Sequence, residues 1–381
     1  MLEQYKLIMP KTIYGGFNAI SNVREIVKDV KKVAIFTYEN VYETGLINPI
    51  IDILIEKGIS FKVFKDLPVE PTYIQAQDVV DRFNLSEADF IIAVGGGSVI
   101  DVAKLVSVLN TDKYTVKDLL ESPSLAKKTI RTLMIPTTAG TGAEATPNAI
   151  VTVPEKSLKV GIVSNEMIAD YVILDAEMIR NLPSSIAAST GIDALAHAIE
   201  CYTSKKANPF SDLYSLGAFE LIINNIESAC DGNMEAKLNM LLASFYAGIA
   251  ITASGTTGVH ALSYPLGGKY HIPHGISNAI MLMPVMRFNE PSIRSLLVGA
   301  YNRVWPYGNI EKDEEKSTWV LDYIEKIIRN LGIPQNLTSF GINRDEVDEL
   351  VKNGMEVKRL LVNNMREITA ADARAMYLQV L

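Results

Sequence analysis

Short apolar runs alternate with longer amphipathic stretches over the first half of the chain. Runs rich in β-branched and aromatic residues predict strands at 33–36, 61–64, 90–94 and 132–135. Between them, residues 47–57 and 73–83 have the spacing of amphipathic helices. Strands that alternate with helices predict a parallel sheet covered on both faces, and right-handed crossovers make it a doubly wound α/β domain.

After Leu182 and Pro183 the pattern changes. Leu, Ala, Met, Glu and Lys recur at helical spacing, and β-branched runs become scarce. This spacing predicts helices at 186–203, 212–226, 234–253 and 319–331. We therefore expect an α/β domain over residues 1–180 and an all-helical domain over residues 181–381.

Charge and composition limit the partners that the chain can bind. The 381 residues include 36 basic and 44 acidic side chains, a net charge of −8, and no basic tract, so a nucleic-acid partner is not expected. The two cysteines, Cys201 and Cys230, form no C-x-x-C pair and indicate reduced thiols of a cytoplasmic protein. The most apolar stretch, 240–253, is shorter than the roughly 18–20 residues of a membrane span and predicts a buried helix.

A glycine turn, GGGS at 95–98, directly follows the strand at 90–94 and precedes a helical stretch. Glycines let backbone N–H groups approach a phosphate, and the helix N-terminus adds positive partial charge. The turn is neither G-x-G-x-x-G, because Ile100 occupies the last position, nor a P-loop. It predicts a phosphate site, with a purely structural turn as the alternative, and Lys104 faces either a phosphate or solvent.

A second polar turn, PTTAGTGAE at 136–144, follows the strand at 132–135. Three threonines among small residues suit a loop that hydrogen-bonds a ligand, and a helix cap followed by a turn explains them equally well. Both turns fall at the carboxyl ends of strands, where open α/β sheets bind their ligands.

All four histidines lie in the predicted helical half. Asp193 and His197 are four residues apart and share one helix face, an arrangement that binds a cation or makes a side-chain hydrogen bond. His260, His271 and His274 fall within 15 residues, among Leu, Pro and Gly. Imidazoles with one carboxylate suit Fe²⁺ or Zn²⁺ and leave a coordination position for a substrate oxygen. Buried histidines satisfied by hydrogen bonds are the alternative.

Together these motifs resemble the iron-containing (group III) alcohol dehydrogenase family. The matching blocks are GGGSVID at 95–101, PTTAGTGAE at 136–144, GIDALAHAIE at 191–200 and VHALSYPLGGKYHIPHG at 259–275, with a weaker match of NMREIT at 364–369. The resemblance implies a Rossmann-like domain and a helical domain with the active site in the cleft between them. It also implies NAD or NADP, one divalent metal (Fe²⁺, alternatively Zn²⁺), and a homo-oligomer, either a dimer or larger.

The same resemblance implies which residues form the site. The family's metal ligands correspond to Asp193, His197, His260 and His274. Its nucleotide-binding positions correspond to Gly95, Gly96, Gly97, Ser98, Asp101, Thr137, Thr138 and Thr141, and Lys159 matches a lysine that points toward the nicotinamide.

The chain departs from the family pattern at two positions. Tyr264 stands where many members have a histidine that handles the substrate proton, and His271 is the nearest replacement. His271 has two candidate roles, the proton path and support of a metal ligand. Tyr38 stands where NAD-preferring members often have an acid, and Glu39 follows one residue later, so the sequence leaves NAD and NADP open.

The expected activity is hydride transfer between a small primary alcohol, or its aldehyde, and the nicotinamide. The alternative is reduction of an anionic aldehyde such as a semialdehyde, or of a hydroxy-acid, sulfonated or phosphonated analogue. Two more distant alternatives are a lyase on the related dehydroquinate synthase scaffold and a catalytically silent nucleotide-binding protein. The partner expected in each catalytic case is a small molecule.

Overall fold

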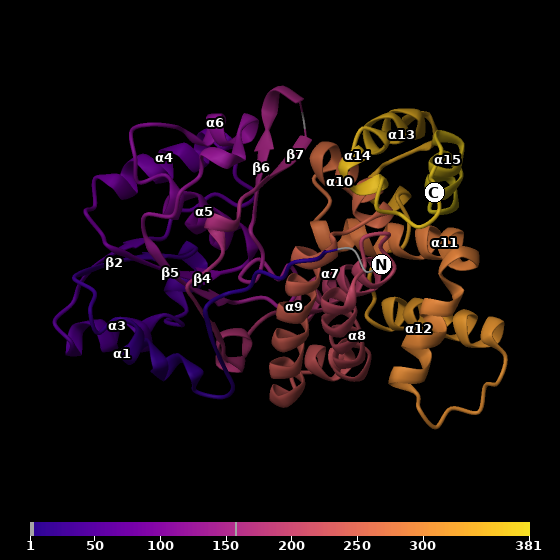
Figure 1. Ribbon diagram of the computed structural model, residues 1–381, viewed down its shortest axis with the longest axis horizontal. Helices are drawn as coiled ribbons and strands as arrows, with labels where there is room; N and C mark the ends of the chain where they lie inside the picture. The colour runs from indigo at the N-terminus through magenta and orange to yellow at the C-terminus, as the bar shows by residue number, and fades with distance from the viewer. Residues whose placement is uncertain (1–3, 157) are drawn as a thin grey trace. The chain divides into compact units, whose positions relative to one another are not determined.

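The structure is a computed structural model, and it describes residues 4–156 and 158–381 (Figure 1). It divides into two compact units, Ile8–Leu182 and Pro183–Leu381, and residues 4–7 group with the second unit. There the Tyr5 ring lies edge-on against Phe210, with 5.3 Å between ring centroids. The assignment of functional domains to 1–180 and 181–381 stays a prediction.

The first unit is built on a six-stranded parallel sheet, in the order β1-β8-β5-β4-β2-β3. Its strands are β1 (Thr12–Gly15), β2 (Lys32–Phe36), β3 (Ser60–Phe64), β4 (Phe90–Gly95), β5 (Arg131–Pro136) and β8 (Tyr171–Leu174). The predicted doubly wound α/β fold is confirmed, and the four expected strands are β2 to β5. Strands β1 and β8 were not predicted.

Helices cover both faces of this sheet (Figure 1). Helices α1 (Val23–Ile26) and α3 (Asn48–Glu56) lie on one face, and α4 (Tyr73–Asn84), α5 (Gly97–Val108) and α6 (Val116–Glu121) lie on the other. The short α2 (Glu39–Glu43) follows β2. An antiparallel hairpin of β6 (Asn148–Val153) and β7 (Leu158–Val163) was not predicted, and β6 is buried at alternate positions, as in a strand with one buried face.

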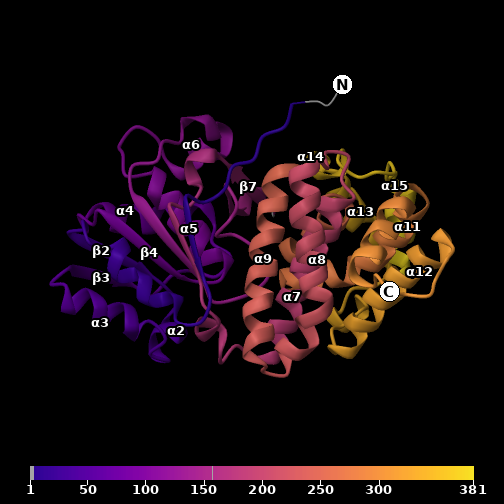
Figure 2. The same cartoon turned by 60° about the horizontal axis from the view of Figure 1, so that its bottom comes forward.

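The described part of the second unit is helical, as the residue pattern predicted. Its helices are α7 (Ser184–Tyr202), α8 (Pro209–Cys230), α9 (Met234–Ser254), α10 (Gly258–Tyr270), α11 (His274–Val304), α12 (Asp313–Asn330), α13 (Val347–Met355), α14 (Lys358–Leu361) and α15 (Ala370–Gln379). Figure 2 shows α7, α8 and α9 side by side. Helix α9 is long and apolar enough to cross a membrane, but most of it is buried against α7 and α8, as in a core helix.

Candidate metal centre

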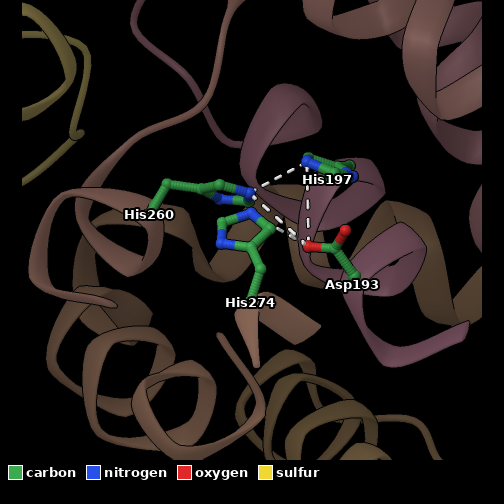
Figure 3. A group of neighbouring side chains, drawn as sticks. All are labelled: Asp193, His197, His260 and His274. Atoms are coloured by element: carbon green, nitrogen blue, oxygen red, sulfur yellow. Dashed lines mark hydrogen bonds and ion pairs between the residues drawn. The ribbon is translucent and has the colours of Figure 1, made fainter. Parts of the chain in front are cut away.

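Three helices of the second unit bring the four predicted ligands together (Figure 3). Asp193 and His197 lie one turn apart on α7, His260 lies in the first turn of α10, and His274 is the first residue of α11. One nitrogen or oxygen of each side chain lies within 4.8 Å of those of the other three. Asp193, His197 and His260 are buried, and His274 is partly exposed.

The donor atoms fit a single divalent ion. The Asp193 Oδ1 atom lies 3.9 Å from His197 Nε2, 3.8 Å from His260 Nε2 and 3.6 Å from His274 Nε2. The Nε2 atoms of His197 and His260 are 2.9 Å apart. A tetrahedral ion with bonds of about 2.1 Å needs donors roughly 3.4 Å apart, within the range of these distances. One carboxylate with three imidazoles is also a donor set that suits Fe²⁺ or Zn²⁺.

Close packing of two helices places His274. A Cβ atom on the next residue, Gly275, would lie 2.2 Å from the backbone oxygen of Ser189 on α7. Only glycine therefore allows the start of α11 to approach the α7 backbone this closely. Asp193 lies one turn further along α7 than Ser189, so this approach brings His274 to its carboxylate.

A buried carboxylate that sequence analysis did not assign holds His260 in place. Glu200 Oε1 accepts hydrogen bonds from the backbone N–H groups of Thr257 (3.0 Å) and Val259 (2.8 Å) and from the Thr257 hydroxyl (2.8 Å). Glu200 Oε2 is paired with His260 Nδ1. With the Nδ1 proton donated to Glu200, the Nε2 lone pair of His260 faces the other ligands, as a metal ligand requires.

The side chain of Asn278 holds Asp193. Its Nδ2 atom donates to Asp193 Oδ1 at 2.6 Å and lies 3.1 and 3.2 Å from the Nε2 atoms of His260 and His274. The Ser263 hydroxyl donates to Asn278 Oδ1 and fixes the orientation of the amide. Burial by itself raises the pKa of Asp193, but the three imidazoles and the amide outweigh it, so the pKa lies below its ordinary value.

The two candidate residues for the proton path lie in different surroundings. Tyr264 is one turn after His260 on α10, and its ring centroid is 6.4 Å from that of His260 and 6.0 Å from that of His274. His271 ends α10 in the left-handed conformation (φ 54°) and is exposed. Within the described residues the His271 side chain makes no hydrogen bond to a metal ligand, so no observed contact supports the role of holding a ligand in place.

In the first unit, the two predicted nucleotide loops lie against each other. Thr137 N–H donates to the Gly95 carbonyl at 3.0 Å. A Cβ atom on Gly97 would lie 3.0 Å from Thr141, and one on Gly96 would lie 3.5 Å from Thr138. Helix α5 starts at Gly97 without a side-chain cap, so the backbone N–H groups of its first turn are available to an anion.

Two polar residues that follow this turn face the protein interior. Lys104 is buried and its ammonium donates to Asp101 Oδ1 (3.3 Å), Thr146 Oγ1 (3.1 Å) and the Asn148 carbonyl (2.7 Å). The expectation that Lys104 faces a phosphate or solvent was therefore wrong. Asp101 Oδ2 also accepts from the Ile150 N–H at 3.1 Å and so ties α5 to β6, whereas Oδ1 pairs with Lys104 on the same helix. Its contact with a nucleotide stays a prediction.

The other two predicted nucleotide residues lie near the same loops. Burial raises the pKa of Tyr38, and its contact with Ser98 partly opposes that rise, so the phenol lies beside the glycine turn. Ser98 Oγ accepts from the backbone N–H of Glu70 at 3.2 Å. Lys159 forms an ion pair of 2.5 Å with the Glu70 carboxylate. A nicotinamide-facing role for Lys159 stays a prediction.

The sequence around Glu200 indicates a buried acid that needs a partner. Glu200 lies in the apolar stretch of α7, seven residues after Asp193 and three after His197, on the same helix face. An acid in an apolar segment needs a partner when it is buried. Its partner, His260, is 60 residues away in sequence, and no local pattern indicates which residue that is.

Comparison with known proteins identifies matches over nearly the whole chain. The iron-containing alcohol dehydrogenase model matches residues 10–176, and the C-terminal model of the Fe-containing alcohol dehydrogenase family matches residues 187–381. The chain is 32% identical to long-chain-alcohol dehydrogenase 1 of Geobacillus thermodenitrificans over 379 residues, covering 98% of this chain and 95% of that protein. It is 33% identical to 4-hydroxybutyrate dehydrogenase of Clostridium kluyveri over 308 residues, covering 80% and 81%. The structure of sulfoacetaldehyde reductase from Bifidobacterium kashiwanohense in complex with NAD⁺ is similar, with a TM-score of 0.87, 25% identity and 99% of both chains covered.

Proposed function

Because the chain belongs to the iron-containing alcohol dehydrogenase family, we propose that it transfers hydride between a small primary alcohol, or its aldehyde, and NAD or NADP. Membership of this family makes the protein an oxidoreductase. The convergence of Asp193 with His197, His260 and His274 is the observation that carries the proposal. A nucleotide-binding or scaffold protein without activity has no need of four donors that meet at one point.

In this proposal the four ligands hold one divalent ion, Fe²⁺ or Zn²⁺. Such an ion supplies Lewis acidity toward a substrate oxygen, and the nicotinamide supplies or accepts the hydride. Glu200 keeps the proton of His260 on Nδ1, and Asn278 fixes the Asp193 carboxylate. These two side chains keep the ligand atoms of His260 and Asp193 oriented toward one point. The negative charge that develops on the substrate oxygen in the transition state would be stabilised by a divalent ion held there.

Reduction of an aldehyde also needs a proton for the product oxygen. Burial raises the pKa of Tyr264, so its hydroxyl keeps a proton near neutral pH beside the metal ligands. We propose Tyr264 as the first candidate donor, and His271, a ribose hydroxyl and water as the alternatives. The pH dependence of kcat/KM in Tyr264→Phe and in His271→Ala distinguishes these candidates. A variant that keeps the wild-type pH profile shows that the replaced side chain does not donate the proton.

Two observations bear on the nucleotide. The backbone N–H groups at the start of α5 and the adjoining threonine loop suit a pyrophosphate. Glu39 is ion-paired with Lys65 at 2.7 Å, and Tyr38 carries no charge that would repel a 2′-phosphate. The proposal therefore includes NADP as well as NAD. A cytoplasmic location and a homo-oligomer are further parts of it, supported by the family resemblance.

The alternative function is reduction of an aldehyde with an anionic group. One observation favours it: the positive charge of Arg359 on α14 acts on both Tyr264 and His260. Two proteins similar to this chain are named for hydroxyacid or sulfonated substrates.

The test of the proposed function combines metal analysis with a turnover assay. We expect the purified enzyme, loaded anaerobically with Fe²⁺, to hold about one ion per chain and to oxidise NADH or NADPH with short aldehydes. His274→Ala should lose the ion and the activity while its circular dichroism is unchanged, whereas His271→Ala should keep the ion. An enzyme that takes up no ion, or a His274→Ala variant with wild-type metal content and turnover, would contradict the proposal.

A further inference from the structure

Arg359 lies on a segment that is tied to the start of helix α10. Leu360, next to it on α14, is buried. Just beyond α14, Asn363 Nδ2 donates to the Thr256 carbonyl at 3.1 Å, and Asn364 Oδ1 accepts from the Gly258 N–H at 3.3 Å. Gly258 begins α10, the helix whose first turn carries His260. These bonds fix the position of α14 relative to the metal ligand.

Tyr264 connects Arg359 with the metal centre. The phenol lies beside the rings of His260 and His274, and the Arg359 guanidinium approaches its hydroxyl. Burial raises the pKa of Tyr264, and the charge of Arg359 opposes that rise. The same charge also reaches the buried His260. A permanent cation therefore stands at the edge of the four-ligand cluster.

Arg359 has no carboxylate partner among residues 4–156 and 158–381. Its side chain is exposed, and it forms no ion pair there, although most other arginines of α7 to α15 do. The two acids of the metal centre are engaged elsewhere, Asp193 with the imidazoles and Asn278, and Glu200 with His260 and the start of α10. The planar guanidinium is thus left with N–H donors that match the oxygens of a carboxylate or sulfonate.

We propose that Arg359 binds the anionic group of a short aldehyde substrate, a carboxylate or a sulfonate, whose carbonyl end lies at the four-ligand centre. The inference rests on the proposed function and narrows its substrate class. In this role Arg359 determines specificity. The guanidinium contacts a substrate group remote from the reacting carbon, and it strengthens the binding of anionic substrates only.

The test uses matched aldehydes and the Fe²⁺-loaded full chain. 4-Oxobutanoate and butanal have the same carbon chain and differ in the terminal carboxylate, and sulfoacetaldehyde provides the sulfonate. For the wild type we expect kcat/KM to be higher for 4-oxobutanoate than for butanal. Arg359→Gln should lower the ratio of these two values by about 10- to 100-fold, mainly through KM of the anion, as for a lost charge-assisted hydrogen bond. Lys358→Gln removes the same charge from the neighbouring exposed residue and should leave the ratio unchanged.

A charge reversal and a binding measurement complete the test. Arg359→Glu should bind a trimethylammonium aldehyde better than the wild type does. Calorimetric titration with 4-hydroxybutanoate in the presence of NAD⁺ or NADP⁺ measures the anion contact even if no aldehyde is turned over. An equal ratio in the wild type and Arg359→Gln, or an equal affinity for 4-hydroxybutanoate, would overturn the inference. Absence of turnover with every aldehyde, beside a calorimetric difference, would instead contradict the proposed function.

Discussion

Replacing Glu200 should weaken metal binding far more than removal of an ordinary surface charge. In Glu200→Gln the Oε1 acceptor is kept, so the N–H groups of Thr257 and Val259 at the start of α10 keep their partner. The group that faces His260 Nδ1 becomes an NH₂ donor. His260 must then move its proton to Nε2, where it points at the other ligands and blocks coordination.

The size of the effect follows from that contact. Loss of a carboxylate partner of a metal-ligating histidine costs 10- to 100-fold in metal affinity, or about 1.4–2.7 kcal/mol, and we expect the upper end because the tautomer reverses. Glu200→Ala should in addition lower the stability of the apo-protein by about 3 kcal/mol or more. It leaves the Thr257 and Val259 N–H groups and the Thr257 hydroxyl, all buried, without their acceptor.

The assay is competition of the apo-protein with a chelator of known affinity for Zn²⁺ or, anaerobically, for Fe²⁺. Thermal unfolding of the apo-form, followed by circular dichroism, separates metal affinity from folding. Glu235→Gln, at an exposed position on α9, is the matched control and should bind metal as the wild type does. Wild-type metal affinity in Glu200→Gln would refute the assignment of the His260 tautomer to Glu200.

Three further predictions concern other parts of the molecule. Burial raises the pKa of Glu144 from 4.5 to about 7, so the folded chain keeps a proton that the unfolded chain releases. The protonated Glu144 therefore contributes its full stabilisation below pH 4.5, and this contribution is lost as the pH rises to 7. Because Gln does not titrate, the free energy of unfolding of Glu144→Gln, measured in urea, should rise relative to the wild type by about 3 kcal/mol between pH 4.5 and 7. No pH-dependent gain would contradict the burial argument. Gly275→Ala should lower both the melting temperature and metal affinity, because its Cβ meets the Ser189 oxygen at 2.2 Å; wild-type values for both would show that α11 can shift freely. Tyr38→Asp should raise the ratio of kcat/KM for NADH over NADPH by charge repulsion, and an unchanged ratio would mean that residue 38 is not beside the ribose.

The sequence pattern predicts those elements that have a strong period. The four apolar runs became β2 to β5, and the helical spacing at 47–57 and 73–83 became α3 and α4. Strands β1 and β8, of four residues each, and the hairpin of β6 and β7 were not predicted, although β6 is buried at every second position. Local periodicity therefore predicts the layers of the fold but misses the two strands, β1 and β8, that complete one side of its sheet.

Convergence of the four ligands could be expected from the motifs, whereas their supporting contacts could not. Glu200 and His260 meet only because α7 packs near α10, and Arg359 approaches Tyr264 across 95 residues of sequence. Lys104 was misjudged for a related reason. Its position about two turns into helix α5 does not indicate that Thr146 and Asn148, in and just before β6, are its partners.

Helix α7 carries three groups of the metal centre at positions 193, 197 and 200. At about 100° per residue they fall within a sector of roughly 60°. A residue inserted or deleted between His197 and Glu200 would rotate Glu200 by about 100° away from both ligands, and one between Asp193 and His197 would rotate the two ligands away from each other. Segment α14 holds none of the four ligands and is attached through Leu360, Asn363 and Asn364. Libraries that aim at new substrates should therefore vary α14 and keep both the length and the register of α7.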